Sequence, residues 1–257
     1  MKHNIEDLLE LAKKAALEAY EELLRLNESQ VLEFSFSNDL PREMKSLADQ
    51  VIEKVILRKL QTSGLSILTE ESGEIEGNQI SNFRFIIDPI DGTVNFIRNL
   101  APSSISIALY DGIMPIFGVI LVFPSGDLAW GGRNFGAFLN NKRLKVSNIG
   151  DISHSVICTG FPSRFQFDNQ NINDFITQII DFGKVRMLGA ASLSLLQVAK
   201  GSAEVYLEEE IMIWDVAAGI AIVEGSGGHV SILPGKNKHS HNVIASNGLL
   251  KYPVRDL

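Results

Sequence analysis

The spacing of apolar residues predicts helices in the first part of the chain. Over residues 5–24, apolar side chains recur three and four positions apart, and Glu and Lys fill the opposite face. The same period returns over residues 46–60. The segment between them, 27–43, is polar and contains Pro41, which disfavours a continuous helix through it. The pattern therefore predicts two amphipathic helices, and we expect the first to serve as scaffold.

The middle of the chain has the pattern of a series of short strands. Residues 83–87 form an apolar run broken only by Arg84, which predicts a buried strand. We expect this strand to end at Asp88-Pro89, because proline cannot extend a central ladder. Several apolar stretches with brief connections follow over residues 102–139, including a hairpin signal at Asp111-Gly112. These stretches predict one antiparallel sheet.

After about residue 141 the pattern changes to an alternation of strands and helices. The predicted strands are 155–159, 185–188, 203–207 and 242–246, and the predicted helices are 172–182, 190–200 and 214–224. Such alternation is typical of an α/β unit. We therefore predict a mixed α/β and α+β fold. Its N-terminal α+β lobe, with the antiparallel sheet, would span residues 1–145, and its C-terminal α/β lobe residues 146–257.

Composition and charge narrow the classes of function. With 45% hydrophobic and 21% charged residues over 257 positions, the chain has the make-up of a globular protein and not of a disordered one. Its formal net charge of -8 argues against binding of a nucleic-acid backbone, and so against a two-metal nuclease. The lone Cys158 cannot form an internal disulfide, and we expect it to be a buried core thiol.

The sequence pattern carries no targeting or membrane signal. Residues 1–26 contain acids early and lack an uninterrupted apolar region, so we expect no signal peptide. The longest apolar run, 112–123, contains Pro115 and is too short to span a bilayer. We expect a soluble, cytoplasmic protein with no membrane partner.

Acidic residues recur where predicted strands end or helices begin. Asp88 and Asp91 follow the strand 83–87, and Gly92-Thr93 then offers a helix start with free N–H groups. Carboxylates beside free backbone N–H groups form a place where a divalent cation and a phosphate can meet. The same residues also fit an ordinary Asx/Pro turn.

Three further acidic motifs also have a purely structural explanation. Asp49 and Glu53 lie four residues apart near the start of a helix, where acids complement the helix dipole. Glu70-Glu71 follows a predicted strand and also fits a solvated edge. Asp215 precedes a run of small residues and also fits a helix N-cap.

Taken together, these motifs resemble the inositol monophosphatase family. The motifs, in the family's order, are Glu70-Glu71-Ser72, Asp88-Pro89-Ile90-Asp91-Gly92-Thr93-Val94-Asn95-Phe96 and Trp214-Asp215-Val216-Ala217-Ala218-Gly219. The resemblance spans nearly the whole chain. It implies a layered αβαβα sandwich of the inositol monophosphatase and fructose bisphosphatase type.

The resemblance also implies a set of metal ligands. One ion would be held by Glu70, Asp88 and the carbonyl of Ile90, a second by Asp88, Asp91 and Asp215, and a third, hydrated ion by Glu70 with Asp49 through water. All-oxygen ligation suits two or three Mg²⁺ ions, with Mn²⁺ as a substitute. The lysine that the family often carries in a mobile loop is missing from residues 29–43, where Asn38 lies near its place.

The implied reaction is magnesium-dependent hydrolysis of a small phosphomonoester, similar to an inositol monophosphate, by a metal-activated water. Glu70 and Thr93 would orient and activate that water, with Asp49 assisting. The N–H groups of Gly92 and Thr93 would receive phosphate oxygens. The remaining substrate contacts would come from Asp91, Ala190, Ala191, Glu208 and Asp215. The neighbouring Glu209 and Glu210 leave the register of the hydroxyl-binding carboxylate open by a residue.

Several alternatives stay open. Val94-Asn95-Phe96 resembles the inositol-phosphate branch, whereas the 3'(2'),5'-bisphosphate nucleotidase branch carries Lys-Glu-Phe. Fructose-1,6-bisphosphatase or another sugar phosphatase is the main competitor, and a non-catalytic interaction protein on the same scaffold is a different class. His239 and His241 fit either a transition-metal clip or a solvated loop. By family analogy we expect a homodimer that acts on a small phosphorylated polyol or sugar and not on nucleic acid.

Overall fold

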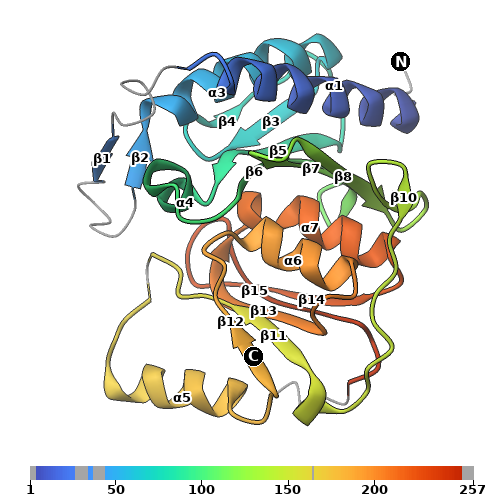
Figure 1. The fold of residues 1–257 in the computed structure, drawn as a ribbon. Coiled ribbons are helices and arrows are strands. Elements are labelled where there is room, and N and C mark those ends of the chain that lie inside the picture. Colours follow the sequence, from blue (N-terminus) through green and yellow to red (C-terminus); the bar gives the residue numbers. More distant parts are fainter. Residues whose placement is uncertain (1–3, 27–33, 37–43, 164, 251–257) are drawn as a thin grey trace.

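The computed structural model describes residues 4–26, 34–36, 44–163 and 165–250, and it arranges them in alternating layers of helices and sheets (Figure 1). The helices of the layers are α1 (Ile5–Leu23) and α3 (Leu47–Leu60), then α6 (Ala191–Ala199) and α7 (Ile213–Gly225), then α5 (Asn169–Ile179). One sheet lies between the first two helix layers, and the other lies between the last two. The predicted αβαβα sandwich is confirmed.

The first sheet has eight strands in the order β10-β9-β8-β7-β6-β5-β3-β4. Their bounds are β3 Ser66–Thr69, β4 Gly73–Ile75, β5 Arg84–Asp91, β6 Ser103–Tyr110, β7 Pro115–Phe123, β8 Asp127–Gly132, β9 Gly136–Leu139 and β10 Lys142–Arg143. All neighbours pair antiparallel except β3 and β5, which are parallel. The strands within residues 102–139 pair antiparallel as predicted, and the parallel pair lies outside that stretch.

The second sheet has five strands in the order β12-β11-β13-β15-β14. Their bounds are β11 Val156–Thr159, β12 Lys184–Arg186, β13 Val205–Met212, β14 His229–Pro234 and β15 Ser240–Ser246. β11 is parallel to both of its neighbours, and the other pairs are antiparallel. The lobe division that we propose between residues 145 and 146 falls in the connection between the two sheets.

The remaining short elements lie beside these layers. They are the antiparallel pair β1 (Phe34–Phe36) and β2 (Met44–Ser46), the helix α4 (Thr93–Arg98), and the 3-10 turns Gln61–Ser63 and Ile152–His154. Asn38, near the place of the family's loop lysine, lies outside the described residues.

The end of β5 differs from the prediction. The strand continues through Asp88-Pro89 to Asp91. Asp88 pairs with Ser106 and Asp91 with Ser104, so the β5 side holds one extra residue and forms a bulge. A bulge leaves a residue without a ladder bond, which is why proline is tolerated there. The predicted strand end at Asp88 was therefore wrong.

Other elements of the second half of the chain also differ from the prediction. β13 extends to Met212 through a second bulge, and β14, which was not predicted, pairs with β15. α5 begins three residues before its predicted start at residue 172 because Asp168 caps it, accepting from the N–H of Asn171 at 2.8 Å. The first turn of α5 is polar, so the apolar pattern did not indicate this start.

The middle helix layer is apolar because it is covered on both sides. In α7 the residues from Val216 to Val223 are all buried, and α7 packs chiefly on β6, β7 and β8 of the first sheet. A helix that is apolar on all sides is expected in such a position. The outer helices instead bury one face, as α1 does with its alanines and leucines.

The tightest contact between these layers is at Gly118 in β7. A Cβ atom on Gly118 would lie 2.1 Å from the carbonyl oxygen of Ala218 in α7. We expect Gly118→Ala to lower the free energy of unfolding by about 1–3 kcal/mol, because the helix and sheet would have to separate. Urea denaturation measures this. Gly150→Ala is the control, since no atom lies within 4 Å of the added carbon; an equal loss in both variants would contradict the explanation.

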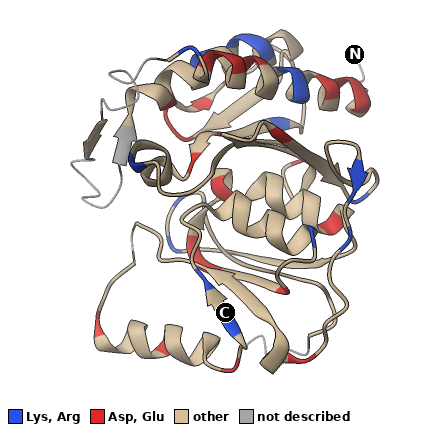
Figure 2. Ribbon diagram, viewed as in Figure 1, with Lys and Arg blue, Asp and Glu red and all other residues tan. Residues whose placement is uncertain are grey.

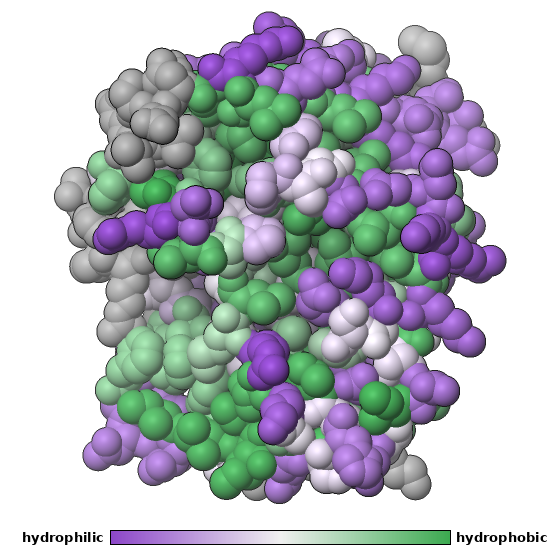
Figure 3. All heavy atoms as spheres, in the orientation of Figure 1, coloured by the Kyte–Doolittle hydropathy of each residue, from purple (hydrophilic) through white to green (hydrophobic). Residues whose placement is uncertain are grey.

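The outer face of α5 exposes apolar side chains. Ile172, Ile176 and Ile180 are exposed at four-residue intervals, and Phe167 precedes them on the connecting loop. At the lower left of Figure 3, green spheres lie among purple ones. None of the described helices combines the length and the apolar composition that crossing a bilayer requires.

Candidate metal and phosphate site

Three acids from separate elements meet at one point. Glu70 directly follows β3, Asp88 lies in β5, and Asp215 lies in the first turn of α7. One carboxylate oxygen from each lies within 4.8 Å of the others. Figure 2 shows acidic residues in red both between the first sheet and the middle helix layer and on the outer helices. The structure thus brings together three residues that the sequence selected from distant motifs.

The electrostatics of this cluster are unfavourable without a cation. Burial raises the pKa of Asp88 well above its usual range, and the charges of Glu70, Asp91 and Asp215 raise it further. The pKa of Asp215 is raised by burial first and then by Glu70 and Asp91. No lysine, arginine or histidine is among the described residues that line the surrounding cavity. A set of mutually repelling oxygen ligands fits a hard divalent cation.

Asp91 is placed differently from the other acids. Its carboxylate accepts from the N–H groups of Ala191 at 3.2 Å and Ser192 at 2.7 Å, and from the Ser192 hydroxyl. It thereby receives the first N–H groups of α6, and burial still raises its pKa to about 6. The second-ion role and the substrate contact predicted for Asp91 stay predictions.

The Asx turn that the sequence left as an alternative is also present. The N–H of Ile90 donates to Asp88 Oδ1 at 3.0 Å, and the Thr93 hydroxyl donates to the carbonyl oxygen of Ile90 at 3.1 Å. The turn and the acidic cluster therefore coexist, because the turn uses one oxygen of Asp88. The roles predicted for the Ile90 carbonyl and the Thr93 hydroxyl stay predictions.

A cavity of about 410 Å³ opens beside the acids. It is lined by the starts of two helices, with Gly92 and Thr93 at α4 and Ala190 and Ala191 at α6. Gly92 has φ 88°, and a Cβ on it would lie 3.1 Å from Ala190 Cβ. Glycine is therefore needed both for the backbone conformation and for the close approach of the two helix starts.

The three neighbouring glutamates of β13 have different environments. Glu208 lines the cavity, is buried, and accepts from the Tyr206 hydroxyl at 3.1 Å. Burial raises its pKa to about 7. Glu209 is exposed and bonds to Gln178. Glu210 also lines the cavity, but its carboxylate is bonded to the loop at Asn237. The geometry favours Glu208 for the substrate contact, which remains a prediction.

Asp49 is buried, and its carboxylate is hydrogen-bonded to the N-cap residue of α3. Its carboxylate accepts from the backbone N–H of Ser46 at 3.2 Å and from its hydroxyl at 2.5 Å, and Ser46 in turn caps α3. Burial raises the pKa of Asp49 to about 7, and the charge of Glu71 adds to this. The water-mediated contribution predicted for Asp49 stays a prediction.

Serines that the sequence analysis did not select lie directly behind the acids. Ser192 donates to Asp91, and its hydroxyl lies 2.6 Å from that of Ser104 in β6. Ser103 donates to the carbonyl oxygen of Gly92 at 2.9 Å. The serines of the otherwise apolar strand β6 could have indicated this in the sequence, because buried hydroxyls need hydrogen-bond partners.

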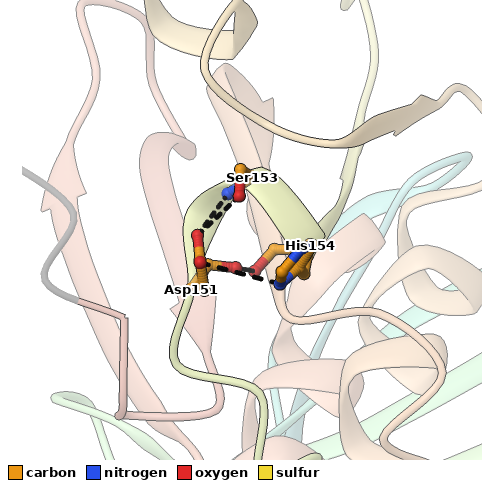
Figure 4. Close-up of polar contacts among 4 residues, drawn as sticks. Asp151, Ser153 and His154 are labelled. Carbon is orange, nitrogen blue, oxygen red and sulfur yellow. Dashed lines mark hydrogen bonds and ion pairs between the residues drawn. The ribbon is translucent and has the colours of Figure 1, made fainter.

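Two histidine-containing groups lie outside the candidate site. Asp151 accepts from the N–H and hydroxyl of Ser153 and lies 3.6 Å from His154 (Figure 4). These are the residue types of a nucleophilic triad, in which the histidine bonds to the serine. Here Ser153 and His154 both contact Asp151 instead, and all three residues are exposed, so the group is not arranged as a triad. His239 lies 3.3 Å from Glu74, and the His241 ring nitrogen lies 3.2 Å from the carbonyl oxygen of His239, as in a polar loop.

Cys158 is a core residue, as expected. Its side chain is 1% exposed, and burial raises the pKa of the thiol to about 11. We therefore expect a thiol reagent at pH 8 to label the folded protein at least about tenfold more slowly than the urea-unfolded protein, because reaction requires the thiolate. Cys158→Ala should keep its activity. Rapid labelling of the folded protein would contradict this placement.

Comparison with known proteins gives a consistent picture. The model of the inositol monophosphatase family matches residues 4–253. The chain is 33% identical over 252 residues to a fructose-1,6-bisphosphatase/inositol-1-monophosphatase of Aquifex aeolicus, covering 96% of this chain and 93% of that protein. It is 34% identical over 224 residues to a Nus factor SuhB of Pasteurella multocida, covering 84% and 81%. The crystal structure of extragenic suppressor protein suhB from Bartonella henselae superposes with a TM-score of 0.81 at 30% identity, covering 95% and 94%.

Proposed function

This chain belongs to the inositol monophosphatase family, and from that premise we propose that it hydrolyses a small phosphomonoester, similar to an inositol monophosphate, in a magnesium-dependent reaction. The products would be the free alcohol and inorganic phosphate. The single observation that carries this proposal is the convergence of Glu70, Asp88 and Asp215 beside a cavity.

The acids fit the divalent ions that the proposal requires. Glu70, Asp88 and Asp215 would hold them, together with Asp91 and the carbonyl of Ile90. When bound, such ions stabilise the charge that develops on the transferring phosphoryl group and lower the pKa of water. Mg²⁺ is proposed because all these ligands are oxygen atoms, and Mn²⁺ can substitute.

The other residues of the cavity position the substrate. The N–H groups of Gly92 and Thr93, at the start of α4, would receive phosphate oxygens. Glu70 and Thr93 would orient the attacking water. Glu208 would accept hydrogen bonds from substrate hydroxyls, with Ala190 and Ala191 completing the wall.

The identity of the alcohol is the open choice within this proposal. Val94-Asn95-Phe96 supports an inositol-phosphate-like substrate. The relative from Aquifex aeolicus carries fructose-1,6-bisphosphatase in its name, so this sugar bisphosphate is the first competitor. A 3'(2'),5'-bisphosphate nucleotide ranks lower.

Phosphate release with and without Mg²⁺ tests the proposal. Inositol 1-phosphate, fructose 1,6-bisphosphate and a 3',5'-bisphosphate nucleotide would be compared by kcat/KM at one protein concentration. We expect Mg²⁺-dependent release, fastest with inositol 1-phosphate. Release that is unchanged by removal of divalent ions would reject the metal-dependent mechanism, and a faster bisphosphate would reassign the substrate.

A non-catalytic interaction role is the alternative of a different class. One relative is named a Nus factor, which keeps this possibility in view. The presence of every predicted metal-binding acid supports catalysis over a role that needs only the scaffold. A homodimer in the cytoplasm remains our expectation from the family, and sedimentation velocity measures the oligomeric state.

A further inference from the structure

Glu53 is a buried acid that the proposed reaction does not use. It lies in the middle of α3 and is 4% exposed. Its Oε1 accepts from the Thr69 hydroxyl at 2.8 Å and from the Ser72 N–H at 3.0 Å, and its Oε2 accepts from the Ser72 hydroxyl at 2.6 Å. A buried carboxylate is retained at low cost only when its oxygens are satisfied in this way.

All three donors flank Glu70, at the end of β3 and in the turn between β3 and β4. Thr69 precedes Glu70, and Ser72 follows it after Glu71. On the other side of the turn, the N–H of Glu70 donates to the carbonyl oxygen of Ile87 at 3.3 Å. The turn is thus held from α3 by Glu53 and from β5 by the backbone.

We infer that Glu53 is a positioning residue, which fixes Glu70 in the geometry that the metal site requires. This inference rests on the proposed function for the role of Glu70. Glu53 acts on Glu70 through Thr69 and Ser72, and it is not among the described residues that line the cavity. A carboxylate suits this task because it only accepts hydrogen bonds and can accept several from one turn at once.

Glutamine in place of Glu53 can preserve all three hydrogen bonds. In Glu53→Gln, the amide oxygen can keep the bonds from Thr69 and from the Ser72 N–H. The amide NH₂ can donate to the Ser72 hydroxyl, which accepts as readily as it donates. In Glu53→Ala all three donors lose their partner, and the turn that carries Glu70 loses its attachment to α3.

Mn²⁺ binding, titrated directly by calorimetry or electron paramagnetic resonance, tests the inference without any turnover. Loss of a partner that orients a metal ligand typically weakens metal binding by about 10–100-fold. We expect Glu53→Ala to raise the Mn²⁺ dissociation constant by at least about tenfold and Glu53→Gln by less than about threefold. Amide exchange over residues 69–73 should accelerate in Glu53→Ala alone.

Glu204→Ala is the matched control. Glu204 is also a buried acid, 2% exposed, and accepts from the N–H of Val156 at 2.6 Å, but it lies directly before β13 and outside the cavity lining. This variant should lose thermal stability and keep its Mn²⁺ affinity.

The outcomes of this test separate the inference from the proposed function. The inference is overturned if Glu53→Ala binds Mn²⁺ as tightly as the Glu204→Ala control, or if Glu53→Gln is as weak as Glu53→Ala. If the unmodified protein binds no Mn²⁺, the metal assignment falls and the role of Glu53 falls with it. Tight binding without turnover would reject the phosphatase proposal alone.

Discussion

Asp88→Asn should lower kcat with the preferred phosphomonoester by on the order of a thousandfold or more, with Mg²⁺ saturating for the unmodified protein. Asp88 is the acid predicted to contact both principal ions, and it lies in the cluster with Glu70 and Asp215. Divalent ions supply several kcal/mol of transition-state stabilisation, and about 4 kcal/mol corresponds to a thousandfold in rate. Steady-state kinetics over a range of Mg²⁺ concentrations measure the loss.

The same substitution should leave the protein folded. Asparagine has nearly the shape of aspartate and removes a charge that its surroundings destabilise, since burial and the neighbouring acids raise the pKa of Asp88. Without metal at pH 8, the variant should therefore be at least as stable as the unmodified protein. Asp181→Asn, on the surface beyond α5, is the control and should keep full activity. A nearly fully active Asp88→Asn enzyme would remove the metal assignment.

The second large effect is on stability in the absence of metal. We expect the free energy of unfolding of the metal-free protein to fall by about 3 kcal/mol or more between pH 4.5 and pH 8, or roughly 6–12 °C in Tm. Burial raises the pKa of Asp91 to about 6 and those of Asp49 and Glu208 to about 7, from ordinary values of 3.8 to 4.5. Over this window the folded protein binds more protons than the unfolded chain, so rising pH favours unfolding.

Magnesium should reverse this trend. It binds the ionised carboxylates, so its stabilising effect should be larger at pH 8 than at pH 5. Differential scanning calorimetry at several pH values, with a chelator or with Mg²⁺, measures both effects. Asp88→Asn should show a shallower decrease with pH. Metal-free stability that rises from pH 5 to pH 8 would contradict the clustered-acid description.

The sequence predicted the layers of the fold because their patterns are local. The period of α1 and the apolar run of β7 are visible in the sequence, and each is buried as expected. The acids of the site could be selected from the sequence because they lie near the ends of predicted strands and helices. Their convergence could not be derived from spacing alone, since Asp215 arrives from a helix on the opposite side of the first sheet from α3.

Besides the serines behind the acids, the sequence did not predict two bulges at the site. One lies between Asp88 and Asp91, and the other lies between Glu208 and Ile211. Each adds a residue to its strand where it reaches the cavity, and each therefore changes which side chains point inward. This is why Pro89 was taken as a strand end, and why the choice among the three glutamates of β13 stayed open.

The contact between Gly118 and Ala218 joins α7 to the first sheet without an intervening side chain. α7, which carries Asp215, therefore packs directly against the sheet that carries Asp88, although it comes from a distant part of the chain. Glu208 belongs to the other sheet. Under the proposed function, Asp88 and the hydroxyl-binding Glu208 thus come from different sheets, so evolution or an engineer could exchange the side chains of β11 and β13 to recruit new substrates while Glu70, Asp88 and Asp215 stay as they are.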